Sequence, residues 1–305
     1  MKTNQLGKSD VYISELTLGC MSLGTDSQEA SKIIDQALDT GINHLDTADL
    51  YDFGVNEEIV GKAIQNKRKD IILTSKVGNN FDRNKKDWHW DPSRSHIKNG
   101  LKDSLRRLQT DYLDFYMLHG GTLDDPIDET ISAFDELKQE GVIRAYGISS
   151  IRPNVIREYV KRSSIDGVMM QYNMLDRRPE EEILDLLNQH DISVLARGPL
   201  AKGFLTDNGV EQIEKKAQDG FLDYSQGELL QIHQKLSNTL NGASLNNTAF
   251  HYILHHPAVA SAVFGASTVD QVKSNSDHYT GNPLNNELYQ SLQAITKPIK
   301  YDKHR

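Results

Sequence analysis

The chain has a single cysteine and no long apolar run, and both absences narrow its class. Cys20 is the only cysteine among 305 residues, which excludes an internal disulfide framework. No stretch approaches the roughly 18 consecutive apolar residues that a membrane-spanning helix needs. The opening residues, MKTNQLGKSD, also lack the apolar segment of a secretory signal. We therefore expect a cytoplasmic protein with no membrane partner.

Positive charge is also in short supply, which disfavours nucleic acid as a partner. Acidic residues number 43 against 34 Lys and Arg, giving a net charge of −9. No basic run stands out that would follow a phosphate backbone. His251 and His255 have a spacing that can bind zinc on a helix, but Tyr252 occupies the place of the general-base Glu in H-E-x-x-H. We predict no metal site.

Short apolar runs alternate with longer amphipathic stretches, a pattern typical of strands joined by crossover helices. The predicted strands are Leu16–Gly19, Ile42–Asp46, Ile71–Lys76, Tyr112–His119, Val142–Gly147, Gly167–Gln171, Ile192–Ala196 and Ser261–Val263. The predicted helices are Ser27–Thr40, Asn56–Asn66, Ser93–Leu108, Asp128–Glu140, Asn154–Arg162, Glu180–Gln189 and Val269–Asp277, with Ser93 and Asp128 as N-caps. Eight such units predict an α/β fold, a (β/α)8 TIM barrel that forms one domain over residues 1–305.

One stretch interrupts the alternation after the seventh strand. Residues 198–226 have no clean period, and two further helical patterns follow at Gly227–Leu240 and Leu245–His255. Structureless loops longer than about 12–15 residues are usually lids or binding segments. We therefore predict extra helices and a long functional loop after strand seven.

Four reactive side chains are expected at the carboxyl ends of three successive strands. Alternating parity makes Asp46, Lys76 and His119 the last inward residues of their strands, and Tyr51 lies just beyond Asp46. A nearby ammonium is expected to lower the phenol's pKa from about 10. Taken singly, each residue is explained by an ordinary ion pair or by loop packing. Together they predict a catalytic site in which Asp46 keeps Lys76 charged and His119 orients a carbonyl oxygen.

These residues resemble the aldo-keto reductases, and the likeness extends from 17-TLGCMSLG-24 to 263-VFGASTVDQVKSN-275. The family pattern D-T-A-x-x-Y-G-x-x-E-x-x-V-G-x-A matches 46-DTADLYDFGVNEEIVGKA-63, with about one extra loop residue before Gly54. The resemblance implies that Asp46, Tyr51, Lys76 and His119 are the catalytic residues. It also implies an NADP(H)-dependent oxidoreductase that reduces aldehydes or ketones to alcohols, with Tyr51 donating the proton.

The cofactor site is implied by the resemblance, because the chain has neither G-x-G-x-x-G nor a P-loop. Relatives bind the dinucleotide in an extended pose across the barrel mouth. Arg197 stands where many of them have an aromatic residue stacked on the nicotinamide. The implied cofactor-binding residues are Gly19, Met21, Asp46, Ser149, Gln171, Arg197, Gly198, Leu200, Lys202, Gly265, Ala266, Thr268, Gln271 and Asn275.

The choice between the two nicotinamide cofactors depends on the segment 264-FGASTVDQVKSN-275. Gly265 and Gln271 occupy positions where many relatives carry Lys and Arg for the ribose 2′-phosphate, and Ser274 replaces an adenine-binding Glu. Lys202, Lys273 or the hydroxyls of Ser267 and Thr268 can compensate for the lost cations. We predict NADP as the cofactor, with NAD as the alternative.

The predicted substrate is a small carbonyl compound or alcohol, bound in a pocket that includes Tyr51, Trp88 and His119. Two other classes of function remain open. Lys76 can be the nucleophile of a Schiff-base aldolase. The barrel can also be a cofactor-binding regulatory subunit, as in some relatives. The sequence leaves open the natural substrate and the oligomeric state.

Overall fold

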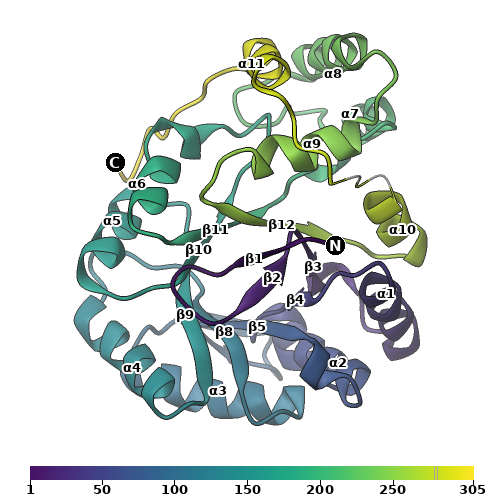
Figure 1. Cartoon of the computed structure of the whole chain (residues 1–305). Coiled ribbons are helices and arrows are strands. Elements are labelled where there is room, and N and C mark those ends of the chain that lie inside the picture. Colours follow the sequence, from purple (N-terminus) through teal and green to yellow (C-terminus); the bar gives the residue numbers. More distant parts are fainter. Residues whose placement is uncertain (278, 280) are drawn as a thin grey trace.

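Eight parallel strands form a closed barrel at the centre of the molecule (Figure 1). The computed structural model describes residues 1–277, 279 and 281–305. The barrel strands are β3 (Leu16–Gly19), β4 (His44–Asp46), β5 (Ile72–Val77), β8 (Leu113–Leu118), β9 (Ile143–Ser149), β10 (Gly167–Gln171), β11 (Ser193–Arg197) and β12 (Val259–Gly265). They follow one another around the barrel in chain order, and β12 pairs with β3 to close it. The predicted (β/α)8 barrel is confirmed.

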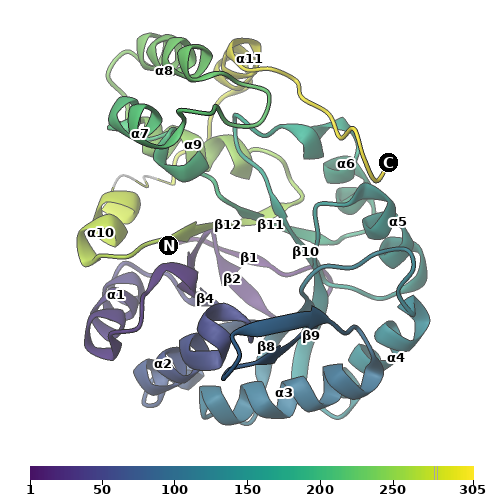
Figure 2. The same cartoon turned by 180° about the vertical axis from the view of Figure 1, so that it is seen from behind.

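Helices surround the barrel in both views (Figures 1 and 2). Those that follow a barrel strand are α1 (Ser27–Asp39), α2 (Val55–Ile64), α3 (Arg94–Leu108), α4 (Ile127–Gln139), α5 (Pro153–Arg162), α6 (Ile183–Gln189) and α10 (Val269–Asp277). Ser93 is the N-cap of α3, as predicted. Asp128 was wrongly predicted as a cap, because Pro126 holds that position in α4. Asp128 lies in the first turn, where its charge still favours the helix dipole.

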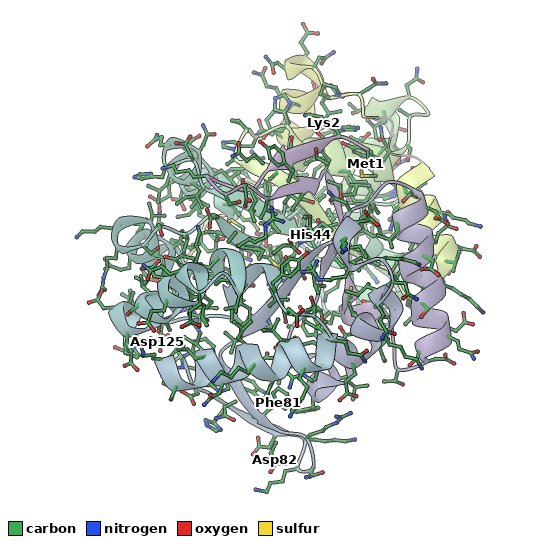
Figure 3. All side chains as sticks on the ribbon, turned by 60° about the horizontal axis from the view of Figure 1, so that its bottom comes forward. Met1, Lys2, His44, Phe81, Asp82 and Asp125 are labelled. Carbon is green, nitrogen blue, oxygen red and sulfur yellow. The ribbon has the colours of Figure 1, made fainter. Side chains whose placement is uncertain are left out.

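The sequence did not predict two short hairpins. The first joins β1 (Thr3–Gln5) to β2 (Tyr12–Ser14), and its Leu6 and Ile13 are buried against Phe115 and Met117 in the barrel interior. It therefore closes the end of the barrel opposite the catalytic face. The second, β6 (Asn79–Asp82) with β7 (Asp87–Trp90), replaces the loop predicted after β5. Figure 3 shows its tip, at Asp82, projecting from the edge of the molecule.

The region after β11 differs from the long loop that was predicted. Residues 209–216 form the helix α7 (Gly209–Lys216), whose only large apolar side chains are Val210 and Ile213, too few to identify a helix from the sequence. The helices α8 (Gln226–Leu240) and α9 (Leu245–Leu254) match the two predicted, and α11 (Asn286–Ile295) was not predicted. Short 3-10 turns complete the fold: η1 (Cys20–Ser22), η2 (Tyr51–Gly54), η3 (Arg68–Asp70), η4 (Arg178–Glu181) and η5 (Ala201–Gly203). Within the described ranges, no helix has the length and apolar character to cross a bilayer.

A chain of hydrogen-bonded polar side chains crosses the barrel interior just below Asp46 and Lys76, and His44, labelled in Figure 3, is its centre. Ser261 donates its hydroxyl to the Ser14 carbonyl at 2.8 Å, so the hydroxyl of Thr17 must donate to Ser261 at 2.6 Å. Thr17 is then free only to accept, and His44 Nδ1 donates to it at 2.8 Å. His44 Nε2 accepts from Thr74 at 2.6 Å. Hydrogen bonding therefore fixes His44 as a neutral imidazole in one tautomer.

We expect His44 to make the fold sensitive to acid. Burial, aided by the charge of Lys76, lowers the pKa of His44 to about 3, whereas an unfolded His titrates near 6.5. Below pH 6.5 only the unfolded state takes up this proton, so stability falls with pH. The gap in unfolding free energy between the native chain and His44→Gln should therefore narrow by about 2 kcal/mol from about pH 7.5 to about pH 5, measured in urea. His190→Gln, at an exposed site, should track the native chain. A constant gap for His44→Gln would contradict a neutral buried imidazole.

Candidate active site

The catalytic face is organised by one buried amine, that of Lys76 on β5. Its Nζ donates to Asp46 Oδ2 at 2.8 Å, to the Thr47 carbonyl at 2.8 Å and to the Tyr51 hydroxyl at 3.3 Å. An ammonium has three N–H donors, and each has one acceptor here. Lys76 is fully buried and Asp46 is 3% exposed. These contacts indicate that Lys76 is charged and donates hydrogen bonds to both the Asp46 carboxylate and the Tyr51 phenol.

Opposing effects set the charge states of this group. Burial lowers the pKa of Lys76, but Asp46 and Tyr51 together outweigh burial and raise it, so the amine is protonated. Burial raises the pKa of Tyr51, and the ammonium only partly offsets that rise. The prediction of a lowered phenol pKa is therefore wrong in its net direction, because desolvation of the phenolate exceeds the attraction of the ammonium. Tyr51 is a neutral O–H donor held in contact with a cation.

His119 follows β8 and faces Tyr51 edge to face, with the ring centroids 5.9 Å apart. Burial, with smaller contributions from Lys76 and Arg197, lowers the pKa of His119 to about 3. The imidazole is therefore neutral and presents one N–H. Its buried Nδ1 has no hydrogen-bond partner in the part of the chain that the structure describes. Two neutral donors thus stand beside one cation.

Tyr51 is placed by an unusual backbone corner. Asp52, Phe53 and Gly54 follow one another with φ values of 48°, 52° and 88°, all left-handed. A left-handed conformation costs a non-glycine residue roughly 1–2 kcal/mol. Asp52 and Phe53 separate Tyr51 from Gly54, whereas the family pattern has glycine directly after the tyrosine. The corner lets the chain turn from Tyr51 into α2 within four residues.

These side chains lie in a cavity of about 950 Å³ at the barrel mouth, within the size range of small-molecule sites. Many predicted site residues line it: Gly19, Met21, Asp46, Tyr51, Lys76, Trp88, His119, Ser149, Arg197, Gly198, Lys202 and Gly265. Others lie outside its lining: Gln171, Leu200, Ala266, Thr268, Gln271 and Asn275. The first group includes all four predicted catalytic residues.

The predicted residues outside the lining have defined contacts. Gln171 accepts from Arg197 Nη1 at 3.2 Å, so it touches a lining side chain. The side-chain oxygen of Gln271 accepts from the backbone of Ser267 at 2.8 Å at the start of α10. Asn275 is buried and accepts from the Asn246 amide at 3.2 Å. The polar groups of Gln271 and Asn275 are therefore engaged within the protein.

The cavity suits an extended anionic cofactor at its β11 and β12 side. Arg197 and Lys202 line it there without an ion-pair partner among the described residues, and Gly198 offers bare backbone beside them. In the same described ranges, no group of three or more His, Cys, Asp or Glu is placed to hold a metal ion. The chemistry of this side therefore suits an anionic group such as a phosphate.

Sequence reasoning missed part of the cavity wall. Trp90 lines the cavity beside Trp88, and the lining residues that the sequence did not indicate are Ser22, Asn79, Gly120, Gly121, Thr122, Ser150, Ile151, Arg152, Met169, Val263 and Phe264. The glycine pair directly after His119 was a readable sign of close packing, because Gly120 lies against the Trp90 ring and Gly121 against Val155. No pattern marked Arg152, a lone arginine before a proline.

Comparison with known proteins agrees with this geometry. The model of the Aldo/keto reductase family matches residues 15–297. The chain is 53% identical over 306 residues to the uncharacterized oxidoreductase YqkF of Bacillus subtilis (strain 168), covering 100% of both. It is 30% identical to the NADH-specific methylglyoxal reductase of Escherichia coli (strain K12), over 90% of this chain and 92% of that protein.

A solved structure is equally similar. The holo form of the aldo-keto reductase AKR11C1 from Bacillus halodurans superimposes with a TM-score of 0.95 at 53% identity, covering 100% of this chain and 99% of that one. The resemblance found in the sequence is confirmed by a family match over nearly the whole length and by relatives that match end to end. The chain belongs to the Aldo/keto reductase family.

Proposed function

We propose that the chain reduces an aldehyde or ketone to an alcohol, with Tyr51 as the proton donor and NADPH as the reductant. The contact of the Tyr51 hydroxyl with Lys76 Nζ at 3.3 Å inside the barrel-mouth cavity carries the proposal. The whole chain acts as one catalytic domain. When bound, the nicotinamide supplies hydride to the carbonyl carbon.

The protein's part is to hold and deliver a proton. The carbonyl oxygen is bound between the Tyr51 hydroxyl and the imidazole of His119, both neutral donors. As negative charge develops on that oxygen, Tyr51 gives up its proton and the Lys76 ammonium stabilises the phenolate left behind. Asp46 keeps Lys76 charged throughout. Burial excludes water, so these interactions are stronger than they would be in solvent.

The preference for NADPH needs a cation near the ribose 2′-phosphate. Gly265 and Gln271 supply none, so we assign the role to Lys273, which is exposed on α10 and has no ion-pair partner among the residues described. NADH is the second candidate, favoured by the missing cations and by the NADH-specific name of one relative.

The other classes of function have less support. Lys76 is a poor Schiff-base nucleophile, because a raised pKa and three acceptors keep its amine protonated. A purely regulatory barrel does not require the intact group of Asp46, Tyr51, Lys76 and His119 in an open cavity.

Tyr51→Phe should lower kcat by about 10²–10⁴-fold, because the transition state loses its acid. Cofactor binding, followed by quenching of protein fluorescence, should change little. Tyr12→Phe, at a half-exposed tyrosine on the hairpin that closes the other end of the barrel, should keep native turnover. Native-like kcat in Tyr51→Phe would overturn the role assigned to this phenol.

Lys273→Gln tests the assignment of the cofactor. We expect the Kd for NADPH, relative to that for NADH, to rise about tenfold, since a hydrogen bond to a charged group contributes roughly 1.5–3 kcal/mol. Fluorescence titration with both cofactors measures the ratio. Lys215→Gln, on the exposed side of α7, is the matched control. A native preference for NADH would refute the choice of NADPH and leave the proposed reduction standing.

A further inference from the structure

One wall of the cavity, on the side of His119 away from β11 and β12, is rigid and aromatic. The indole of Trp90 donates to Asp125 Oδ1 at 3.0 Å. Its ring lies so close to two glycines that a Cβ added to Gly78 or Gly120 would come within 2.6 Å or 3.2 Å of it. Trp88, half exposed on the same hairpin, also lines the cavity. This wall can bind the apolar body of a small substrate.

Arg152 stands in the same wall and has a definite geometry. Its Nη1 donates to the Gly121 carbonyl at 2.7 Å, and its backbone N–H donates to the Ser150 hydroxyl at 3.2 Å. Gly121 is two residues beyond His119, and two residues of extended chain span at most about 7 Å. The guanidinium is therefore tied to the segment that follows His119, in the cavity that Tyr51 and His119 also line, and it has donors left over.

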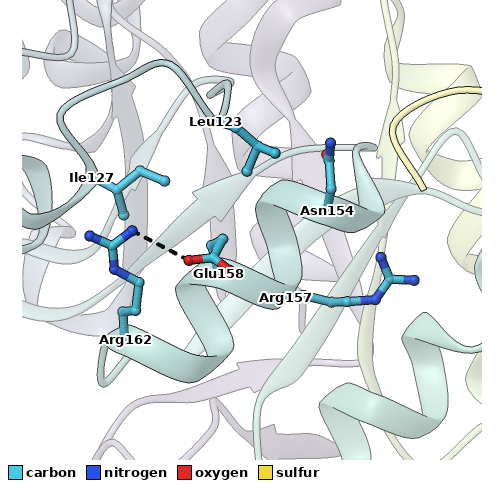
Figure 4. A pocket seen from close by; sticks show the side chains of 6 residues that line it. All are labelled: Leu123, Ile127, Asn154, Arg157, Glu158 and Arg162. Carbon is cyan, nitrogen blue, oxygen red and sulfur yellow. Dashed lines mark hydrogen bonds and ion pairs between the residues drawn. The ribbon is translucent and has the colours of Figure 1, made fainter.

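No carboxylate among the described residues forms an ion pair with Arg152. The surface groove between α4 and α5, of about 400 Å³, offers a contrast (Figure 4). There Arg162 pairs with Glu158, drawn as a dashed line, and Arg157 pairs with Glu182. The arginines of that groove are neutralised by the protein itself. Arg152 is half-buried and its guanidinium donates to one backbone carbonyl, so its charge is available to an anion that enters the cavity.

The other charged groups of the cavity do not take this role. Asp46 and Lys76 neutralise each other at 2.8 Å. Arg197 contacts Gln171 on the β10 and β11 side, and Lys202 lies in η5, which follows β11. Arg152 is thus the cation that remains available to a substrate on the side of the cavity formed by Trp90 and the loop after His119.

We infer that Arg152 forms an anion subsite that selects carbonyl substrates bearing a carboxylate. The inference rests on the proposed reduction and names its substrate class. A short apolar or aromatic spacer packs on Trp90, the carboxylate takes the free donors of Arg152, and the carbonyl lies between Tyr51 and His119. An arginine can bind a carboxylate through two parallel hydrogen bonds, which fixes orientation as well as charge.

Matched aldehydes test the subsite. 4-Formylbenzoate and its methyl ester share a ring and a carbonyl and differ in charge. The ratio of their kcat/KM values should fall about tenfold to a hundredfold in Arg152→Gln, since a charge-assisted hydrogen bond is lost. Arg152→Lys should give an intermediate ratio, because it keeps the charge without the fork. Arg157→Gln, on α5 in the paired groove, should keep the native ratio.

Each other outcome has a distinct meaning. An unchanged ratio in Arg152→Gln, with native thermal unfolding, overturns the subsite and leaves the reduction intact. A matching rise in the Kd for NADPH also overturns it, because the cation then serves the cofactor. If the native chain reduces neither aldehyde, the proposed reaction fails. Calorimetric binding of 4-formylbenzoate to the native chain and Arg152→Gln then decides the subsite without turnover.

Discussion

The ion pair between Lys76 and Asp46 is the constraint on which the rest of the site depends. Both charges are buried at the barrel mouth, and removing one partner of such a pair typically costs about 3–5 kcal/mol. Two adjacent strands must therefore hold their register, and the hydrogen-bonded layer through His44, one inward position below, helps to do so. The hydrogen bonds from Lys76 to Asp46 and to the Thr47 carbonyl offset the cost of burying the charge, and they direct the third N–H of Lys76 to the Tyr51 hydroxyl.

In this site, the positive charge is on Lys76, and the groups that can donate a proton to a substrate, Tyr51 and His119, are neutral. A barrel interior disfavours every ionised form, and it keeps both Tyr51 and His119 neutral although a full positive charge lies beside them. A phenol that stays protonated until an oxyanion forms is suited to donation, whereas a phenol already ionised at rest has no proton to give. In the proposed reaction, the ammonium therefore stabilises the phenolate that proton transfer leaves behind more than it changes the resting phenol.

The sequence was enough to predict the strands and the faces of their side chains, because both follow from local hydrophobic patterns. Buried strands read as short apolar runs, and side-chain parity brought Asp46 and Lys76 to one face. The helix α7 was missed because it is short and has only two large apolar side chains, Val210 and Ile213, too few to show a period. The net pKa shift of Tyr51 depends on desolvation, a property of the assembled cavity. Arg152 was missed because it stands out only by lining the cavity without an ion-pair partner among the described residues, and the sequence does not show which residues surround it.

The cavity is lined by positive side chains that have no ion-pair partner among the described residues, although the chain as a whole carries a net negative charge. The chain carries a net −9, yet the cavity presents Arg152, Arg197 and Lys202 beyond its one neutralised pair. Because physiological salt screens surface charges beyond about 8–10 Å, the acidic exterior weakly opposes an anion that has already entered. Local cations then decide how it lies. Arg152 is tied to the loop after His119, so the distance between its guanidinium and the Tyr51 hydroxyl is fixed. A substrate that binds both groups must match this distance, and the enzyme should therefore select substrates by spacer length as well as by charge.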